Sequence, residues 1–290
     1  MPAVIDVELA YRAPMDAEGV IAYLARRAIR GIEEIVDGAY RRSVRLARGA
    51  GILELAPGAG RVRARFQLDD AADEPLAIER SRALFDLDAD PQAILDALHP
   101  DPLIGPLIRA NPGRRVPGHV DPDEIAFRAV LGQQVSLGGA ATLAGRLVAD
   151  YGEPLRSPLG AVTHLFPTAR ALARADPERL PMPASRRRAL IGLAEALDEG
   201  TVALGPTVDR TEARRRLLEL PGIGPWTADY VALRALRDPD AFLPSDLGLR
   251  RALERLGLDG SPANAAKLAA NWRPYRAYAL MHLWATLADQ

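Results

Sequence analysis

Residues 211–236 encode two helices joined by a glycine turn, and this segment constrains the fold more than any other. Apolar residues at helical spacing predict one helix over Thr211–Leu218 and a second over Pro225–Leu236, with proline at its first position. The segment between them, Leu220-Pro-Gly-Ile-Gly224, has the composition of a tight turn. We therefore expect a helix-hairpin-helix unit.

The turn has the features of a phosphate-binding site. Gly222 and Gly224 lack a Cβ, so a ligand can approach the main chain closely. The free N–H groups that begin the second helix lie beside them and attract anions. Phosphate contacts position a protein on DNA without reading its sequence. We expect a contact with double-stranded DNA through Gly222, Ile223, Gly224 and Thr227.

Further motifs accompany this turn along most of the chain. Asp246 lies sixteen residues after Tyr230, at the end of the segment Leu243-Pro-Ser-Asp246. The others are Leu84-Phe-Asp-Leu87, Ala129-Val-Leu-Gly-Gln-Gln-Val-Ser136 and the segment Trp272–Trp284. With these motifs the chain resembles the helix-hairpin-helix, Gly/Pro-Asp superfamily of base-excision DNA glycosylases, and within it the DNA-3-methyladenine glycosylase II family. The resemblance spans roughly residues 1–287.

The resemblance implies an α+β fold. A small N-terminal domain with an antiparallel sheet is expected over 1–88, and a mainly helical glycosylase core over 89–290. Within this core we expect two subdomains. One covers about 113–230 and holds most of the helix-hairpin-helix 211–236, and the other combines 89–112 with 231–290.

Residue patterns agree with this division. Alternating or continuous apolar residues predict strands at 4–9, 42–46, 52–55 and 61–66, with a helix over 17–29. Helical spacing then predicts helices at 92–98, 123–151, 168–175, 185–199, 247–256, 263–271 and 273–288. Pro122-Asp123, Pro167-Thr168 and Ser185 are candidate helix starts.

Composition excludes several classes of protein. The 290 residues contain no cysteine, which rules out disulfides, cysteine nucleophiles and cysteine-ligated metal clusters. His99, His119, His164 and His282 lack metal-ligand spacing. There is no apolar run of about 18 residues and no signal-peptide pattern, so we expect a cytoplasmic protein that reaches the nucleoid through its substrate.

The overall charge does not suggest a DNA-binding protein, but its distribution does. The net charge is −1, whereas affinity for DNA comes from Lys and Arg that neutralise phosphates. Clusters of arginine occur in the C-terminal half, for example at 186–188 and 214–216, while acidic residues dominate 69–101. A local basic face is therefore expected within a neutral chain.

Asp246 has two interpretations. It follows a proline and precedes an apolar-periodic segment, as a helix N-cap does. By similarity to the family it is the catalytic aspartate, whose carboxylate stabilises an oxocarbenium-like transition state while water attacks the sugar. Both roles are compatible, because the positive end of a helix dipole favours a carboxylate in its ionised form.

Trp226, Tyr230 and Trp284 match aromatic residues that line the family's base pocket. Aromatic faces attract a cationic alkylated base, whereas in an ordinary helical protein such residues belong to the core. Trp272 and Tyr275 are interpreted as core residues. In superfamily members that also cut the backbone, the position of Trp226 holds a Schiff-base lysine. The single lysine, Lys267, falls on a predicted surface helix, so no lyase activity is expected.

Two further features follow from the resemblance. The family's wedge, which fills the gap left by a flipped base, lies in the loop matching Leu131–Val135. Here Gln133 and Gln134 are either wedge residues or interior polar bridges. Backbone carbonyls matching Leu218, Leu220 and Ile223 coordinate a sodium or potassium ion in relatives. No other cofactor is expected.

The sequence thus favours a monomeric, monofunctional glycosylase for 3-methyladenine and other alkylated purines. A glycosylase for neutral lesions such as hypoxanthine is one alternative, and it would call for donors to the base from Tyr230, Gln133 or Gln134. A non-catalytic module that only binds duplex DNA is the other. That module would need Gly222 and Gly224 but not Asp246.

Overall fold

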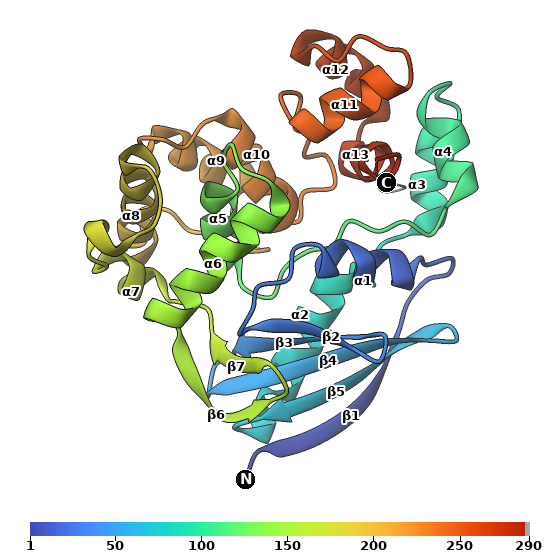
Figure 1. The fold of residues 1–290 in the computed structure, drawn as a ribbon. Coiled ribbons are helices and arrows are strands. Elements are labelled where there is room, and N and C mark those ends of the chain that lie inside the picture. The colour runs from blue at the N-terminus through green and yellow to red at the C-terminus, as the bar shows by residue number, and fades with distance from the viewer. Residues whose placement is uncertain (288–290) are drawn as a thin grey trace.

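A computed structural model describes residues 1–287, and its fold is α+β, as expected. Its larger sheet has five antiparallel strands in the order β1-β5-β4-β3-β2 (Figure 1). The strands are β1 (Ala3–Ala10), β2 (Glu33–Val36), β3 (Ala39–Arg45), β4 (Ala50–Gly58) and β5 (Arg61–Leu68).

One face of this sheet is apolar and covered by helices. In β5, Val62, Ala64 and Phe66 are buried, while the arginines between them are exposed, which is the two-residue period of a half-buried strand. The apolar face packs against α1 (Ala17–Ala25) and α2 (Glu74–Phe85). The apolar residues of the alternating pattern that predicted these strands are therefore the ones that the structure buries.

Several elements differ from the expectations. The helix expected over 17–29 ends at Ala25. The strand β2 was not predicted, because its Glu33 and Glu34 give no apolar pattern. Two helices, α2 and α4 (Ile104–Ala110), were also missed.

The single helix expected over 123–151 is wrong. The structure divides it into α5 (Pro122–Leu131) and α6 (Leu137–Tyr151). Gln134 between them has a φ of 56°, which no α-helix accommodates. Ser136 then starts α6 by accepting a hydrogen bond from the Gly139 N–H at 3.1 Å.

A second, two-stranded sheet also went unpredicted. It consists of β6 (Glu153–Leu159) and β7 (Val162–Leu165), which pair antiparallel around Gly160 at a φ of 60°. Strand β7 lies beside β3 (Figure 1). Pro and charged residues in β6 obscure its strand pattern.

The other helices form two groups that face each other above the sheet (Figure 1). One group contains α5 to α10, and the other contains α3, α4 and α11 to α13. The bounds not yet given are α3 (Pro91–Leu98), α7 (Ala169–Ala173), α8 (Ala184–Asp198), α9 (Arg210–Glu219), α10 (Pro225–Arg234), α11 (Leu247–Arg255), α12 (Pro262–Ala269) and α13 (Arg276–Ala285). Short 3-10 turns occupy Ala71–Asp73, Pro177–Arg179 and Ala270–Trp272.

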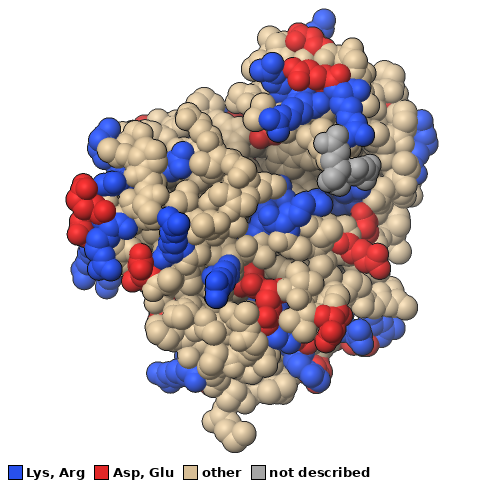
Figure 2. All heavy atoms as spheres, viewed as in Figure 1, with Lys and Arg blue, Asp and Glu red and all other residues tan. Residues whose placement is uncertain are grey.

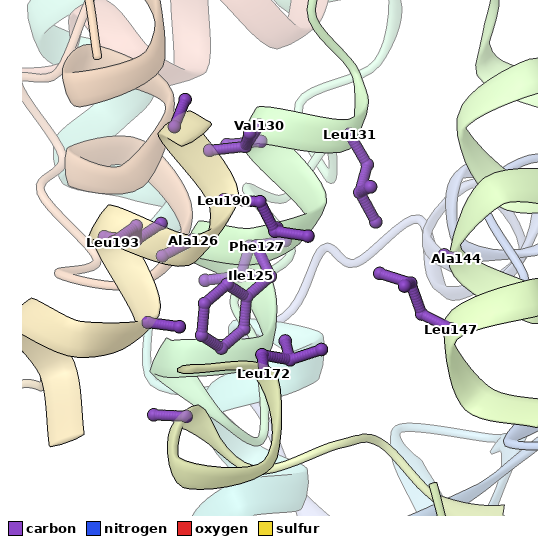
Figure 3. Close-up of a cluster of buried hydrophobic side chains, with 14 of the residues drawn as sticks. Ile125, Ala126, Phe127, Val130, Leu131, Ala144, Leu147, Leu172, Leu190 and Leu193 are labelled. Atoms are coloured by element: carbon purple, nitrogen blue, oxygen red, sulfur yellow. The ribbon is translucent and has the colours of Figure 1, made fainter. Parts of the chain in front are cut away.

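Helix α5 is the centre of the first helical group. Phe127 and Val130 lie in one buried cluster with Leu190 of α8, Leu147 of α6 and Leu172 of α7 (Figure 3). Since α5 ends at the loop that carries Gln133 and Gln134, this core fixes where the loop begins.

The hydrophobic clusters cross the expected domain boundaries. Ile29 and Ile32 of the N-terminal segment belong to the cluster around α5, and Met281 of α13 packs into the cluster beneath the sheet. Trp272 is fully buried, as expected, and Tyr275 packs at the edge of the same cluster. The division at residue 88 and the subdomain limits stay predictions. Of the helices within residues 1–287, none has the length and apolar character that a membrane span requires.

A buried ion network joins the sheet to α5. Arg42 of β3 contacts Glu124 at 2.8 Å and Glu33 at 3.3 Å, and Arg128 contacts the same two carboxylates at 2.9 and 3.0 Å. The side chains of Arg42, Glu33 and Glu124 are each 2% exposed. Removing one member of such a network leaves an uncompensated buried charge.

We predict that Glu33→Gln lowers the free energy of unfolding by about 3 kcal/mol at neutral pH, because Arg42 and Arg128 lose a shared counter-charge. Urea unfolding measures this loss. Glu178→Gln is the control: it removes a surface pair whose carboxylate is 85% exposed, and it should cost about 0–1 kcal/mol. Equal effects of the two substitutions would contradict the prediction.

The same substitution should change the response to acid. Burial would raise the pKa of Glu33, but Arg128 and Arg42 outweigh it and hold the pKa below its usual value of 4.5. Stability from this group is therefore complete above pH 4.5 and is lost as the pH falls through the lowered value. Glu33→Gln should flatten this acid loss.

Candidate active site

A cleft of about 1140 Å³ lies where the sheet and the two helical groups meet. Its walls come from α1, the loop between α5 and α6, α10, α11 and α13. Figure 2 shows Lys and Arg side-chain atoms, in blue, within a hollow at the middle of the face that is turned toward the viewer. Of the C-terminal arginines, Arg234 and Arg251 line the cleft, whereas the clusters at 186–188 and 214–216 do not. The other arginines of the lining come from the N-terminal half, at 26, 27, 42, 114, 115 and 128.

Asp246 lies in this cleft and is held by three N–H groups. It is the N-cap of α11, and its Oδ1 accepts a hydrogen bond from the Leu249 N–H at 2.8 Å. The indole N–H of Trp284 donates to Oδ1 at 2.8 Å, and that of Trp226 donates to Oδ2 at 2.9 Å. Asp246 is therefore a helix cap, and it is also oriented by tryptophans of two other helices.

The predicted aromatic residues come together around this carboxylate. Trp226 and Tyr230 lie one turn apart on α10 and stack with ring centroids 5.4 Å apart. Trp284 lies on α13, and a Cβ on Gly248 would come within 3.2 Å of its ring and 3.0 Å of Asp246 Oδ1, so a larger residue at 248 would crowd this contact. All three aromatic residues line the cleft and are half-buried.

The hydrogen bonds from Trp226 and Trp284 to Asp246 were not predicted, because the sequence gave only an aromatic pocket. A spacing between distant residues carries no information about the direction of an indole N–H.

The structure adds three cleft residues that the sequence analysis missed. Arg234 of α10 donates to the hydroxyls of Tyr23 at 2.8 Å and Tyr230 at 3.2 Å, and to the Gly118 carbonyl at 3.0 Å. Arg27 lies over the Tyr23 ring, 3.6 Å from its centroid. No local signal identifies Tyr23, because its helix α1 is about 200 residues away in the chain. Burial raises the pKa of Tyr230, but Arg234, Arg27 and Arg128 together with the Tyr23 hydroxyl outweigh it, and the net shift is downward.

The hairpin has the expected turn geometry. Gly222 has a φ of 85°, and a Cβ there would also meet the Ala189 Cβ at 2.7 Å. The fold itself therefore requires glycine at this position, whether or not a ligand binds. A Cβ on Gly224 would meet nothing within 4 Å, and no side chain caps α10 after it. The first turn of α10 is thus open to a ligand. Ile223 is buried and anchors the turn.

Gln133 and Gln134 have different surroundings. The side-chain amide of Gln133 donates to the Gly222 carbonyl at 3.0 Å and to the Thr227 hydroxyl at 2.9 Å, while the main-chain carbonyl of Gln133 accepts from Arg186 at 2.5 Å. Gln133 is therefore a half-buried polar bridge that ties the loop to the hairpin. The side chain of Thr227 is buried and occupied by this bridge, which leaves only its main chain for DNA. Gln134 is exposed at the cleft.

The cation site at the hairpin stays a prediction. The Leu220 carbonyl accepts from the Ile223 N–H at 3.1 Å, which leaves one of its lone pairs for an ion. Leu218 and Ile223 would supply the other two carbonyls. Within residues 1–287 no cluster of His, Asp and Glu has a geometry that would hold a metal ion. Lys267 is exposed on α12 and does not line the cleft.

Comparisons with known proteins agree with this geometry. The family model described as AlkA N-terminal domain matches residues 6–121. Mycobacterium tuberculosis proteins named probable bifunctional transcriptional activator/DNA repair enzyme AlkA are 48% identical over 98% of this chain. The chain spans 57% of their length. A solved 3-methyladenine DNA glycosylase from Archaeoglobus fulgidus shares the fold, with a TM-score of 0.82 and 22% identity over 97% of each chain.

The Escherichia coli protein DNA-3-methyladenine glycosylase 2 is 38% identical over 96% of both chains. Such identity extends through both helical groups and the sheet, well beyond the helix-hairpin-helix. The chain belongs to the DNA-3-methyladenine glycosylase 2 family.

Proposed function

We propose that this protein is a monofunctional DNA glycosylase that releases 3-methyladenine and related alkylated purines from duplex DNA. The observation that carries the proposal is the Asp246 carboxylate, which two indole N–H groups orient within an aromatic-walled cleft. A volume of about 1140 Å³ accommodates a flipped nucleotide. The names of the family's members support the substrate class.

In the proposed reaction the bond between C1′ and the base nitrogen breaks, and its electrons leave with the base. Positive charge develops on the deoxyribose, and the fixed carboxylate of Asp246 stabilises that charge more than it stabilises the neutral sugar. Water then adds at C1′ and loses a proton. An alkylated purine is already cationic, so it leaves without a strong acid.

The aromatic walls favour the same substrate. The faces of Trp226 and Tyr230 attract a cationic ring by roughly 0.5–2 kcal/mol per contact. Because Trp226 occupies the position at which lyases of the superfamily hold a lysine, and Lys267 lies outside the cleft lining, no Schiff base with the sugar is expected. The proposed product is an intact strand with an abasic site.

A second candidate is release of neutral purines such as hypoxanthine, which leave poorly unless a donor reaches the base. The Gln133 amide is occupied by the hairpin, which removes it as that donor. The Tyr230 hydroxyl, beside Arg234 and with a lowered pKa, is the observation that favours this activity. A non-catalytic DNA-binding module gives no reason for three elements to converge on one carboxylate.

We predict that Asp246→Asn lowers base release by about 10²–10³-fold while duplex binding is retained, because the substitution removes a charge that acts in the transition state. The measurement is chromatographic identification of bases freed from methylated duplex DNA, together with a binding assay. Wild-type protein should also leave the strands uncut until alkali is added. A wild type that binds DNA but frees no base would refute the catalytic proposal.

Gln134 is proposed as the wedge, since it is exposed at the cleft mouth in a loop that Gln133 holds against the hairpin. Gln134→Ala should slow release from a duplex by about tenfold, corresponding to about 1.4 kcal/mol, and should leave release from single-stranded DNA unchanged, because only a duplex has a gap to fill. Single-turnover rates on matched oligonucleotides test this. Equal slowing on both substrates would exclude a wedge role.

A further inference from the structure

Among the charged residues of the cleft, Arg251 has no assigned role. It lies on α11, in the cleft lining, and its side chain is exposed. Leu247 and Arg251 are four residues apart and therefore share one face of the helix. Both follow Asp246, so Arg251 begins about 7.5 Å along the helix axis from the carboxylate's residue.

Most of the other cleft arginines are already engaged, although the exposed side chain of Arg26, like that of Arg251, has no hydrogen bond or ion pair within residues 1–287. Arg128 binds Glu33 and Glu124, and Arg234 binds two tyrosine hydroxyls. Arg115 donates to main-chain carbonyls, and Arg27 stacks on Tyr23. These contacts hold the walls together and leave little capacity for a ligand.

Arg251 forms no ion pair or hydrogen bond with any of residues 1–287. The acidic residue best spaced to pair with it is Glu254, but Glu254 binds Arg250 at 2.8 Å. Asp246 is already occupied by three N–H donors. Arg251 is therefore an uncompensated guanidinium beside the reaction centre.

A guanidinium in this position matches one ligand in particular. Its planar fork binds two oxygens of a phosphate at once. A nucleotide whose C1′ faces Asp246 carries a backbone phosphate on each side of its sugar, and the exposed Leu247 offers an apolar surface between the two sites. We propose that Arg251 binds a backbone phosphate beside the flipped nucleotide and so holds the deoxyribose against Asp246.

This inference rests on the proposed glycosylase function and adds a substrate-positioning residue to it. It differs from the hairpin contact, because the hairpin lies in the first helical group and α11 in the second (Figure 1). The DNA strand would thus be held on both sides of the cleft.

The test compares Arg251→Gln with Arg251→Lys and with Arg255→Gln as the matched control. Arg255→Gln removes the same charge from an exposed position in the last turn of the same helix, outside the cleft lining, and leaves the Arg250–Glu254 pair intact. Two quantities are measured: the single-turnover rate of 3-methyladenine release, and the salt dependence of binding to a duplex that contains a tetrahydrofuran abasic analogue. Undamaged duplex of the same sequence provides the reference.

For Arg251→Gln we expect about tenfold slower release, and a slope of log affinity against log salt that is reduced by about 0.9 on the abasic duplex but unchanged on undamaged duplex. Arg251→Lys should restore the slope and part of the rate, since it keeps the charge but loses the fork. Arg255→Gln should match wild type in both quantities.

Three results would overturn the inference. If Arg251→Gln matches Arg255→Gln while wild type releases base, Arg251 is a solvated surface residue and the glycosylase proposal stands. If its slope falls equally on damaged and undamaged duplex, Arg251 is a general backbone contact. If wild type releases no base at all, the proposed function fails and this inference fails with it.

Discussion

The carboxylate of Asp246 is the point on which the rest of the structure converges. Its partners are the N–H of Leu249 on its own helix, the indole of Trp226 on α10 and the indole of Trp284 on α13. Hydrogen bonds to a charged group are worth about 1.5–3 kcal/mol each, and they fix direction as well as energy. Any shift between the two helical groups would break at least one of them.

The remaining architecture keeps those helices in place. Helix α10 packs on α5, which the buried ion network joins to strand β3 of the sheet. Helix α13 places Met281 in the core between the same sheet and the helices that cover it. The sheet and these helices therefore form a platform that sets the spacing of the two cleft walls. The hydrogen bonds of Gln133 to the hairpin also hold the loop that carries Gln134 in place.

Sequence patterns predicted what depends on local spacing. The helix-hairpin-helix has a turn whose conformation requires Gly222, and the helix after Asp246 has a sharp polar start, so both were visible in the chain. Four of the larger sheet's strands were visible through their alternation. Strand β2 was hidden because its Glu33 is buried by pairing with Arg42 of the next strand and with Arg128 of a helix far along the chain, which an apolar pattern does not record. The break at Gln134 was missed because apolar residues continue at helical spacing on both sides of it.

The sequence predicted which residues form the site but not the hydrogen bonds that join them. Asp246, Trp226, Tyr230 and Trp284 do meet in one cleft, but the direction of the two indoles depends on how α10 and α13 cross α11. Tyr23 reaches the cleft through the packing of the sheet domain, so it has no signal near the motif.

The central claim is that the two tryptophans act through Asp246, and a double-mutant cycle tests it most directly. Single-turnover release of 3-methyladenine would be measured for wild type, Trp284→Phe, Asp246→Asn and the double variant. Our account predicts that Trp284→Phe slows the wild type by about 10–100-fold, the rate equivalent of one charged hydrogen bond, and has no further effect once Asp246 is replaced. Equal slowing in both backgrounds would show that Trp284 acts on the base independently of the carboxylate, and would contradict the account.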